Sequence, residues 1–406
     1  MNDGMSDIEA ILNRTTIPKM MEPMMPSLAC PVRRELEDLS VDLTDKAARL
    51  AGAVRPAIQI AIGDLVRSMN CYYSNLIEGH DTHPADIERA LKRDYSNEPK
   101  KRDLQNEAVA HIAVQNMIDT GEAPPAVSEN FIQWTHKEFC SRLPDTLLHV
   151  TDPATKEMIN VIPGHYRERD VEVGRHLPPE PSALPRMLER FANAYNLERL
   201  GRVDRVIAVA ASHHRLAWIH PFLDGNGRVT RLFSHAMMKE IGIGSALWSI
   251  SRGFARNVER YKETLMRADL PRQGDRDGRG ALSEAGLAEF CRFFLETAID
   301  QVEYMSDMLD TARLLDRLER HVAIAAVEKR LPKESYPLLR EAFLVGSFAR
   351  GKAGMLIGAS PAKARPILKT LLMAGYLTSE TPKSPVRLAF PTTTLEDVFP
   401  RLYPAR

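Results

Sequence analysis

The sequence has few cysteines, no net charge and no long apolar run, and each absence excludes a class of protein. Its four cysteines lie far apart, without CxxC spacing or the density of a disulfide scaffold: Cys30, Cys71, Cys140 and Cys291. The 54 Lys and Arg residues balance 54 Asp and Glu residues, which argues against a protein that binds polyanions over its whole surface. No segment approaches the apolar length that a bilayer requires, and the N-terminus opens with acidic residues. We therefore expect a soluble protein of the reducing cytoplasm, with no membrane contact.

The length of 406 residues predicts two or three domains, because it exceeds the size at which a single core usually stops growing. The sequence shows no internal repeat and no low-complexity tract. We expect an N-terminal arm with helices at 1–100, a core at 101–270, linking helices at 271–332 and a small separate domain at 333–406.

Helical rather than alternating periodicity dominates, so the fold class is predicted to be mainly α. The expected helices are 45–68, one starting near His83 to Asp86, 103–118, 182–200, 203–219, 228–241 and a long one over 281–325. Residues 1–45 are assigned no fold beyond an arm lying over the body, and 269–280 is a polar loop. The segment 203–219 is apolar on nearly every face of its first half, which predicts a buried central helix.

The twelve residues from His220 to Arg231 combine groups that suit nucleotide chemistry: His-Pro-Phe-Leu-Asp-Gly-Asn-Gly-Arg-Val-Thr-Arg. A turn with Gly225 and Gly227 can direct backbone N–H groups inward at the start of a helix, which favours anions. Arg228 and Arg231 are spaced i, i+3 on one helix face, so both can clamp a polyphosphate.

Two other groups of this segment can take part in the reaction itself. Asp224 alone is too little for a protein-only metal cage, but it suits Mg²⁺ that keeps waters and takes further oxygens from phosphates. His220 titrates near neutral pH and can accept a hydroxyl proton as that oxygen attacks phosphorus. Separately each feature is more often an ordinary helix end or turn, but core packing gives no reason for all of them to coincide.

The segment resembles the signature of the Fic family, His-x-Phe-x-Asp/Glu-Gly-Asn-Gly-Arg-x-x-Arg, at every specified position. The resemblance implies a Fic-type helical bundle and transfer of AMP from ATP to a Ser, Thr or Tyr hydroxyl of a protein, with release of pyrophosphate. It makes His220 the general base and Phe222 the anchor of the loop. The same resemblance assigns the nucleotide contacts: Asp224 to Mg²⁺, Gly225, Asn226 and Gly227 to the diphosphate, and Arg228 and Arg231 to the outer phosphates.

Two further segments are similar to parts of the same family. Residues 161–167 followed by 171–173 have the turn and alternation of a β-hairpin and resemble the Fic flap, which pairs with the backbone of the target protein. The flap residues expected to dock the target are Gly164, His165, Tyr166 and Arg167. Asn257 and Tyr261, spaced i, i+4, are placed near the adenine by the resemblance, although Tyr261 is equally consistent with a packing residue.

The segment Ser74-Asn75-Leu76-Ile77-Glu78-Gly79 is similar to the inhibitory motif of Fic proteins, Ser/Thr-x-x-x-Glu-Gly/Asn. The resemblance assigns Glu78 to a salt bridge with Arg231 that keeps the γ-phosphate of ATP from its productive position. We therefore expect an autoinhibited resting state.

The C-terminal residues are locally basic, with 11 basic and five acidic side chains in 333–406. A helix over 353–357, a turn at Gly358 and a Ser360-capped helix over 361–374 resemble a helix-turn-helix, with strands at 376–379 and 386–390 as a wing. The second helix carries three basic residues: Lys363, Arg365 and Lys369. The sequence leaves open whether this winged helix binds DNA, binds a protein or forms a homodimer.

Three alternatives follow from the same residues. The site could remove AMP from a modified target, with Glu78 orienting a water, or the chain could be a DNA-binding regulator that senses nucleotide. A metal enzyme built on His213, His214 and His220 is disfavoured because adjacent histidines on a helix point in different directions. The sequence does not identify the target protein, which could be the chain itself.

Overall fold

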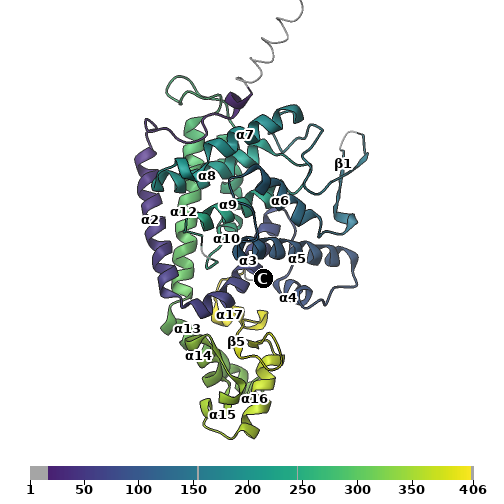
Figure 1. The fold of residues 1–406 in the computed structure, drawn as a ribbon, viewed down its shortest axis with the longest axis vertical. Helices are drawn as coiled ribbons and strands as arrows, with labels where there is room; N and C mark the ends of the chain where they lie inside the picture. Colours follow the sequence, from purple (N-terminus) through teal and green to yellow (C-terminus); the bar gives the residue numbers. More distant parts are fainter. Residues whose placement is uncertain (1–16, 153–154, 245, 404–406) are drawn as a thin grey trace, which may run out of the picture.

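A computed structural model describes residues 17–152, 155–244 and 246–403, and these residues form a helical body with a smaller lobe at one end. Figure 1 shows α2 (Arg33–Ala53) lying along α12 (Glu284–Met308) at one side of the body, while α13 to α17 form the lobe. The mainly α fold class expected from the sequence is confirmed. No helix among the described residues is long and apolar enough to cross a bilayer.

The N-terminal region is more helical than expected. A short 3₁₀ turn, Pro18–Met21, precedes α2, which already begins at Arg33 within the segment that we had assigned no fold. The single helix predicted over 45–68 is wrong, because the chain breaks at Val54 and resumes as α3 (Pro56–Ile77). Proline restricts the residue before it and cannot donate the hydrogen bond that a continuous helix needs.

The helices α4 (Pro84–Leu91), α5 (Pro99–Thr120) and α7 (Leu184–Ala194) lie close to or within their predicted ranges. The helix α6 (Glu129–Cys140) was not predicted. The ring of His83 accepts a hydrogen bond from the Ala85 backbone N–H and so caps α4, as the His-Pro pair predicted. The last two turns of α3 include Cys71 to Ile77, so the connection to α4 is shorter than the sequence suggested.

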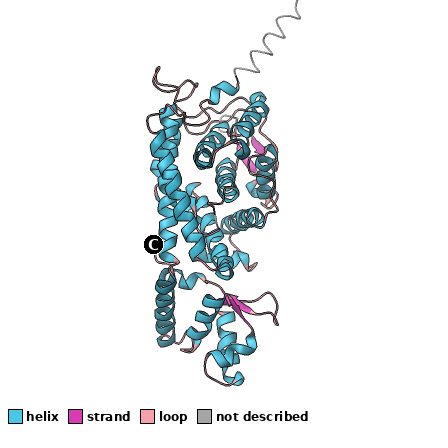
Figure 2. Ribbon diagram, turned by 60° about the vertical axis from the view of Figure 1, so that its left-hand side comes forward, coloured by secondary structure: helices cyan, strands magenta, loops and turns pink. Residues whose placement is uncertain are grey.

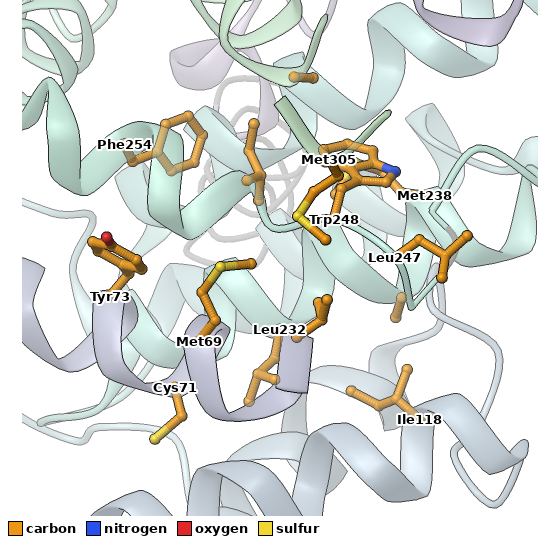
Figure 3. Close-up of a cluster of buried hydrophobic side chains, with 14 of the residues drawn as sticks. Met69, Cys71, Tyr73, Ile118, Leu232, Met238, Leu247, Trp248, Phe254 and Met305 are labelled. Atoms are coloured by element: carbon orange, nitrogen blue, oxygen red, sulfur yellow. The ribbon is translucent and has the colours of Figure 1, made fainter. Parts of the chain in front are cut away.

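The body is built around two central helices, α8 (Arg202–Ile219) and α9 (Asn226–Glu240), which contact each other. Every residue of α8 from Val206 to Leu216 is buried, which confirms the central position predicted for it. The helices α10 (Ile250–Arg256) and α11 (Val258–Ala268) pack against α12, and their side chains Phe254 and Tyr261 contact His213 of α8. Figure 3 shows the apolar side chains that join these elements, among them Met69 of α3, Leu232 of α9 and Phe254 of α10.

The helix predicted over 281–325 is two helices. α12 ends at Met308 and α13 (Thr311–Val327) begins after Asp310, whose carboxylate accepts a hydrogen bond from the Arg313 N–H. An aspartate at this position caps the second helix and so allows the chain to change direction.

The small lobe contains short helices and a small antiparallel sheet, whose strands are drawn in magenta in Figure 2. Its elements are α14 (Ser335–Val345), β3 (Ser347–Phe348), α15 (Ala353–Leu356), α16 (Pro361–Met373), β4 (Leu377–Thr378), β5 (Val386–Leu388) and α17 (Leu395–Val398). The three strands lie in the order β3-β5-β4. The strand β3 was not expected, because two residues are too few to give a periodic signal. The element order agrees with a helix-turn-helix followed by a wing; its assignment as a winged helix stays a prediction.

The lobe and the body are joined by the C-terminal segment. The Tyr73 hydroxyl of α3 donates to the Leu402 carbonyl at 2.8 Å, and the Tyr304 hydroxyl of α12 donates to the Pro400 carbonyl at 3.1 Å. Arg252 donates to the carbonyls of both Arg401 and Leu402. The end of the described chain is therefore held against three helices of the body.

The hairpin predicted over 161–173 does not form as expected: its residues make one isolated antiparallel bridge, between Val173 and His176, and a hairpin that was not predicted precedes them. The strands are β1 (His149–Thr151) and β2 (Met158–Asn160), which pair antiparallel just before the predicted segment. Residues 161–167 themselves form an irregular connection with Gly164 at a φ of +79°. Within 161–173 only Val161 and Arg167 are buried, so the alternation of residue types does not correspond to a strand with one buried face.

Candidate active site

The predicted motif forms the connection between α8 and α9, and we call residues 220–225 the motif loop. α8 ends at His220 in the left-handed conformation (φ 49°), and Gly225 caps α9 with a φ of 81°. The amide side chain of Asn226 accepts from the Phe222 N–H at 2.9 Å and donates to the Phe222 carbonyl at 2.8 Å. Phe222 itself is completely buried, as expected of an anchor. The loop is therefore fixed from both ends before any ligand binds.

Arg167 corrects one sequence prediction. It was expected to dock a target protein, but its side chain is 2 % exposed and serves the motif loop instead. Its backbone N–H donates to the Pro221 carbonyl at 2.9 Å, and its Nε donates to the His220 carbonyl at 2.8 Å. The other guanidinium nitrogens donate to the carbonyls of Arg169 and Pro179. A buried guanidinium satisfied by backbone carbonyls stabilises the loop and offers no surface to a partner.

His220 is partly buried, and this burial lowers the pKa of its imidazole to about 4. The backbone carbonyl of Ala217 opposes this shift, and the Arg167 charge adds to it. The ring is therefore neutral at pH 7 and can accept a proton, as a general base must.

Asp224 is exposed at the tip of the motif loop. One carboxylate oxygen, Oδ1, accepts from the Gly225 N–H at 2.6 Å. Among the described residues no three His, Cys, Asp or Glu side chains gather into a metal site. A divalent cation held here would thus take its remaining ligands from water and phosphate, which is how Mg²⁺ is usually bound with nucleotides. The exposed carboxylate fits that role.

Arg231 is engaged by the segment predicted to be inhibitory. Its Nε donates to the Ser74 hydroxyl at 2.9 Å, and its Nη2 forms an ion pair with Glu78 Oε1 at 2.6 Å. The Arg231 side chain is 2 % exposed, whereas that of Glu78 is 31 % exposed. Burial alone would raise the pKa of Glu78, but the charges of Arg231 and Arg228 outweigh it and hold that pKa below its ordinary value.

Gly227 explains how the Glu78 carboxylate reaches this position. A Cβ at residue 227 would overlap Glu78 Oε1 and would crowd the Arg231 guanidinium. Any larger side chain at the start of α9 would therefore displace the carboxylate. Glycine is needed at this position because it lets the Glu78 carboxylate approach the backbone of α9, and not because of a positive φ.

Arg228 forms an ion pair with a carboxylate that was not predicted from the sequence. Its guanidinium forms an ion pair with Glu107 of α5, which is completely buried and also accepts from His80 Nδ1 at 2.8 Å. Neither motif arginine therefore points freely into an open phosphate site, contrary to the expectation of a paired clamp. Glu107 could have been found from its position in the sequence, because it shares the buried face of α5 with His111 and Val114. An unpaired carboxylate there would lose hydration free energy, so a buried positive partner is expected.

His136 of α6 is a second site residue that was not predicted from the sequence. Its ring is buried and stacks on Phe222 with a centroid distance of 3.8 Å and an interplanar angle of 3°. It also accepts from the Gly164 N–H at 2.8 Å. No local sequence pattern marks this role, because its partners lie 28 and 86 positions away.

The remaining predicted site residues divide into exposed and buried ones. His165 and Asn257 are exposed, and Tyr166 packs partly against Phe222. Tyr261 is 5 % exposed, stacks on Phe254 and has its hydroxyl 2.8 Å from His213 Nε2. Tyr261 is thus a core residue in this structure and presents no free face to an adenine ring.

His213 and His214 do not build a metal site with His220. His213 bonds to Ser234 and Tyr261, whereas His214 faces Asp269. The two rings are buried among different elements, as their adjacency on a helix predicted. Burial lowers the pKa of both imidazoles.

Comparison with known proteins gives a family for this site. Residues 126–238 match the Fic/DOC family. The chain is 38 % identical over 79 residues to the protein adenylyltransferases Fic of Drosophila erecta and Drosophila melanogaster. The match covers 20 % of this chain and 16 % of those proteins, so it is limited to a small part of each relative.

Two solved structures share the fold. A Fic family protein from Desulfovibrio desulfuricans superposes with a TM-score of 0.50 at 15 % identity, over 90 % of this chain and 98 % of that one. A Fic domain containing signaling protein from Bacteroides thetaiotaomicron also gives a TM-score of 0.50, at 20 % identity, over 66 % of this chain and 96 % of that one. The segment that matches the Fic/DOC family, residues 126–238, includes the whole motif loop but neither Glu78 nor Tyr261. Residues 126–238 of the chain therefore form a Fic/DOC domain.

Proposed function

We propose that the chain is a protein adenylyltransferase that transfers AMP from ATP to a Ser, Thr or Tyr hydroxyl of a protein. In this reaction the hydroxyl oxygen attacks the α-phosphorus of ATP, and the bond from that phosphorus to the bridging oxygen breaks. Pyrophosphate leaves, and neutral His220 takes the hydroxyl proton. Catalysis of this reaction depends mainly on positioning the hydroxyl and the α-phosphate and on neutralising the charge of the phosphates.

The observation that carries the proposal is the motif loop, where a neutral imidazole and an exposed carboxylate precede the N-terminus of α9. A helix N-terminus with glycine at its cap suits a diphosphate, because its first N–H groups have no partner within the helix. When bound at Asp224, Mg²⁺ would neutralise charge on the phosphates. The names of the Drosophila relatives support the same activity.

We further propose that Glu78 inhibits this activity. ATP brings a γ-phosphate that would compete with the Glu78 carboxylate for Arg231. The ion pair at 2.6 Å and the bond to Ser74 support this role, since they occupy the guanidinium before nucleotide binds. Glu78 follows the last turn of α3 and is partly exposed, so it can leave without unfolding a helix.

The test uses ATP labelled on the α-phosphate, Mg²⁺ and three proteins: wild type, Glu78→Gly and His220→Ala in the Glu78→Gly background. We expect label and an AMP-sized mass gain, on the chain or on a protein of the cell lysate, with the Glu78→Gly variant only. Absence of label in all three, with the proteins folded, would contradict AMP transfer.

Removal of AMP from a modified target is the second candidate. It is favoured by the partly exposed Glu78 carboxylate beside the motif loop, which could orient a water toward a phosphodiester. Incubation of an AMP-modified target with wild type and Glu78→Gly separates the two activities, because removal needs Glu78 whereas transfer does not.

For the C-terminal lobe we propose a DNA or protein partner, or a second copy of the chain. The exposed basic residues of α16 support it: Lys363, Arg365 and Lys369. A regulator that only senses nucleotide is disfavoured by the base form of His220, which sensing does not need. We also propose a reducing cytoplasmic location, which agrees with four buried free cysteines.

A further inference from the structure

His136 lies outside the motif, yet its imidazole makes a directed contact with two different parts of the site. Besides its stack on Phe222, it lies between Gly164 of the 161–167 segment and Asp224 of the motif loop. The ring is fully buried, so these contacts are not shared with solvent.

The contacts fix the tautomer of the ring. The Gly164 backbone N–H can only donate, so Nδ1 of His136 carries a lone pair and the proton is on Nε2. The protonated Nε2 lies 3.2 Å from the Asp224 carbonyl oxygen, which accepts the hydrogen bond, and 3.3 Å from Cys140 Sγ one turn later on α6.

Each partner of His136 has a separate place in the proposed reaction. Asp224 carries the carboxylate proposed for Mg²⁺, and its carbonyl immediately precedes Gly225 at the cap of α9. Gly164 belongs to the segment expected to meet the target protein, and a Cβ there would lie 3.0 Å from Lys137 Cβ on α6. The ring of His136 thus bridges the segment expected to meet the target protein and the nucleotide side.

We propose that His136 is a positioning residue that aligns the 161–167 segment with the motif loop: Nδ1 fixes the target side and Nε2–H fixes the metal side. This inference rests on the proposed function. A residue with two separable contacts predicts two separable kinetic defects, whereas a residue that only fills space predicts one common defect.

The experiment uses isosteric replacements in the Glu78→Gly background. The amide oxygen of His136→Asn can occupy the place of Nδ1, and the amide nitrogen of His136→Gln can occupy the place of Nε2. His136→Phe keeps the stack and loses both contacts. Lys137→Gln, which keeps its Cβ against Gly164, is the matched control on the same helix.

We expect His136→Asn to keep the KM for the target but raise the Mg²⁺ concentration needed for half-maximal rate roughly threefold to tenfold, the effect of one lost hydrogen bond. His136→Gln should raise the target KM by a similar factor and keep the Mg²⁺ dependence. His136→Phe should show both defects, and Lys137→Gln neither. Equal defects in all three His136 variants, in proportion to a lower melting temperature, would overturn the inference.

Amide hydrogen exchange provides a readout without catalysis. The Gly164 N–H should stay protected in His136→Asn and lose protection in His136→Gln and His136→Phe. The Gly225 N–H should lose protection in His136→Asn and stay protected in His136→Gln. If AMP transfer is absent from the Glu78→Gly parent while this pattern holds, the proposed function fails and the bridging geometry stands; an unchanged pattern in all variants overturns the inference itself.

Discussion

Glu78 and Arg231 are 153 positions apart in the sequence and form an ion pair of 2.6 Å at the start of α9. The arginine is buried and also held by Ser74, while the carboxylate retains 31 % of its exposure. The exposed partner is thus the one that can move, and the buried partner is the one that a γ-phosphate would need.

Replacement of Glu78 by Gly or Gln should raise the rate of AMP transfer at least tenfold. Charge-assisted hydrogen bonds contribute about 1.5–3 kcal/mol, and each 1.4 kcal/mol corresponds to a factor of ten. Incorporation of labelled AMP over time measures the change. Glu138→Gln, which removes a carboxylate paired with Arg142 on the surface, should leave the rate as in wild type; an equal rise there would contradict a specific inhibitory contact.

The pH dependence of the Glu78→Gly variant should reflect His220. Burial lowers its pKa to about 4, and only the neutral ring can accept a proton. The kcat/KM for transfer should therefore be level above about pH 6 and fall tenfold for each pH unit below the pKa. A pH–rate profile between pH 4 and 8 tests this. A midpoint near the ordinary histidine value of about 6.5 would mean that the ring is solvated in the free enzyme.

Arg167→Met should destabilise the fold and distort the motif loop together. Removal of the Arg167 guanidinium leaves the carbonyls of His220 and Pro179 without a hydrogen-bond donor. Hydrogen bonds to a charged group contribute about 1.5–3 kcal/mol each. Urea denaturation measures the loss in free energy of unfolding, and AMP transfer in the Glu78→Gly background measures the loss of activity. Arg169→Met provides the comparison, because Arg169 forms an exposed ion pair with Glu157 and should cost less than about 1 kcal/mol.

Glu107→Gln should lower the pKa of His80. The hydrogen bond to Glu107 raises that pKa despite partial burial, so the protonated ring is favoured in the folded state. The stabilisation is complete below about pH 6.5, the unfolded value, and disappears as pH rises through the higher folded pKa. Titration by NMR should show the His80 pKa near or below its ordinary value in the variant. No change would mean that the carboxylate of Glu107 does not act on His80.

Tyr73→Phe should loosen the C-terminal segment without unfolding α3. The hydroxyl donates to the Leu402 carbonyl, and a neutral hydrogen bond contributes about 1 kcal/mol. Faster amide exchange over 399–403, with unchanged exchange in α9, is the expected result. Tyr336→Phe, a tyrosine within the lobe itself, serves as the comparison and should leave exchange over 399–403 unchanged.

Local signals were sufficient where one short segment carries its own chemistry. The central helix, the cap at His83 and the turn at Gly225 follow from hydrophobic spacing and from residues that favour particular backbone angles. The same signals failed at Val54 and at Leu309, where one predicted helix is two. The helical spacing of apolar residues continues across both breaks. Each break is marked by one residue only, Pro56 at the first and the capping Asp310 at the second, and one residue changes the overall periodicity little.

The sequence by itself determined the mainly helical fold class and the identity of the motif loop, because helix propensity and the Gly-Asn-Gly turn act within a few residues. Only the tertiary structure decided the partners of its charged groups. Arg228 meets Glu107, Arg167 holds the His220 carbonyl and His136 stacks on Phe222. A buried charge or imidazole must find its partner within about 3 Å, and the packing of distant helices determines which residue lies there.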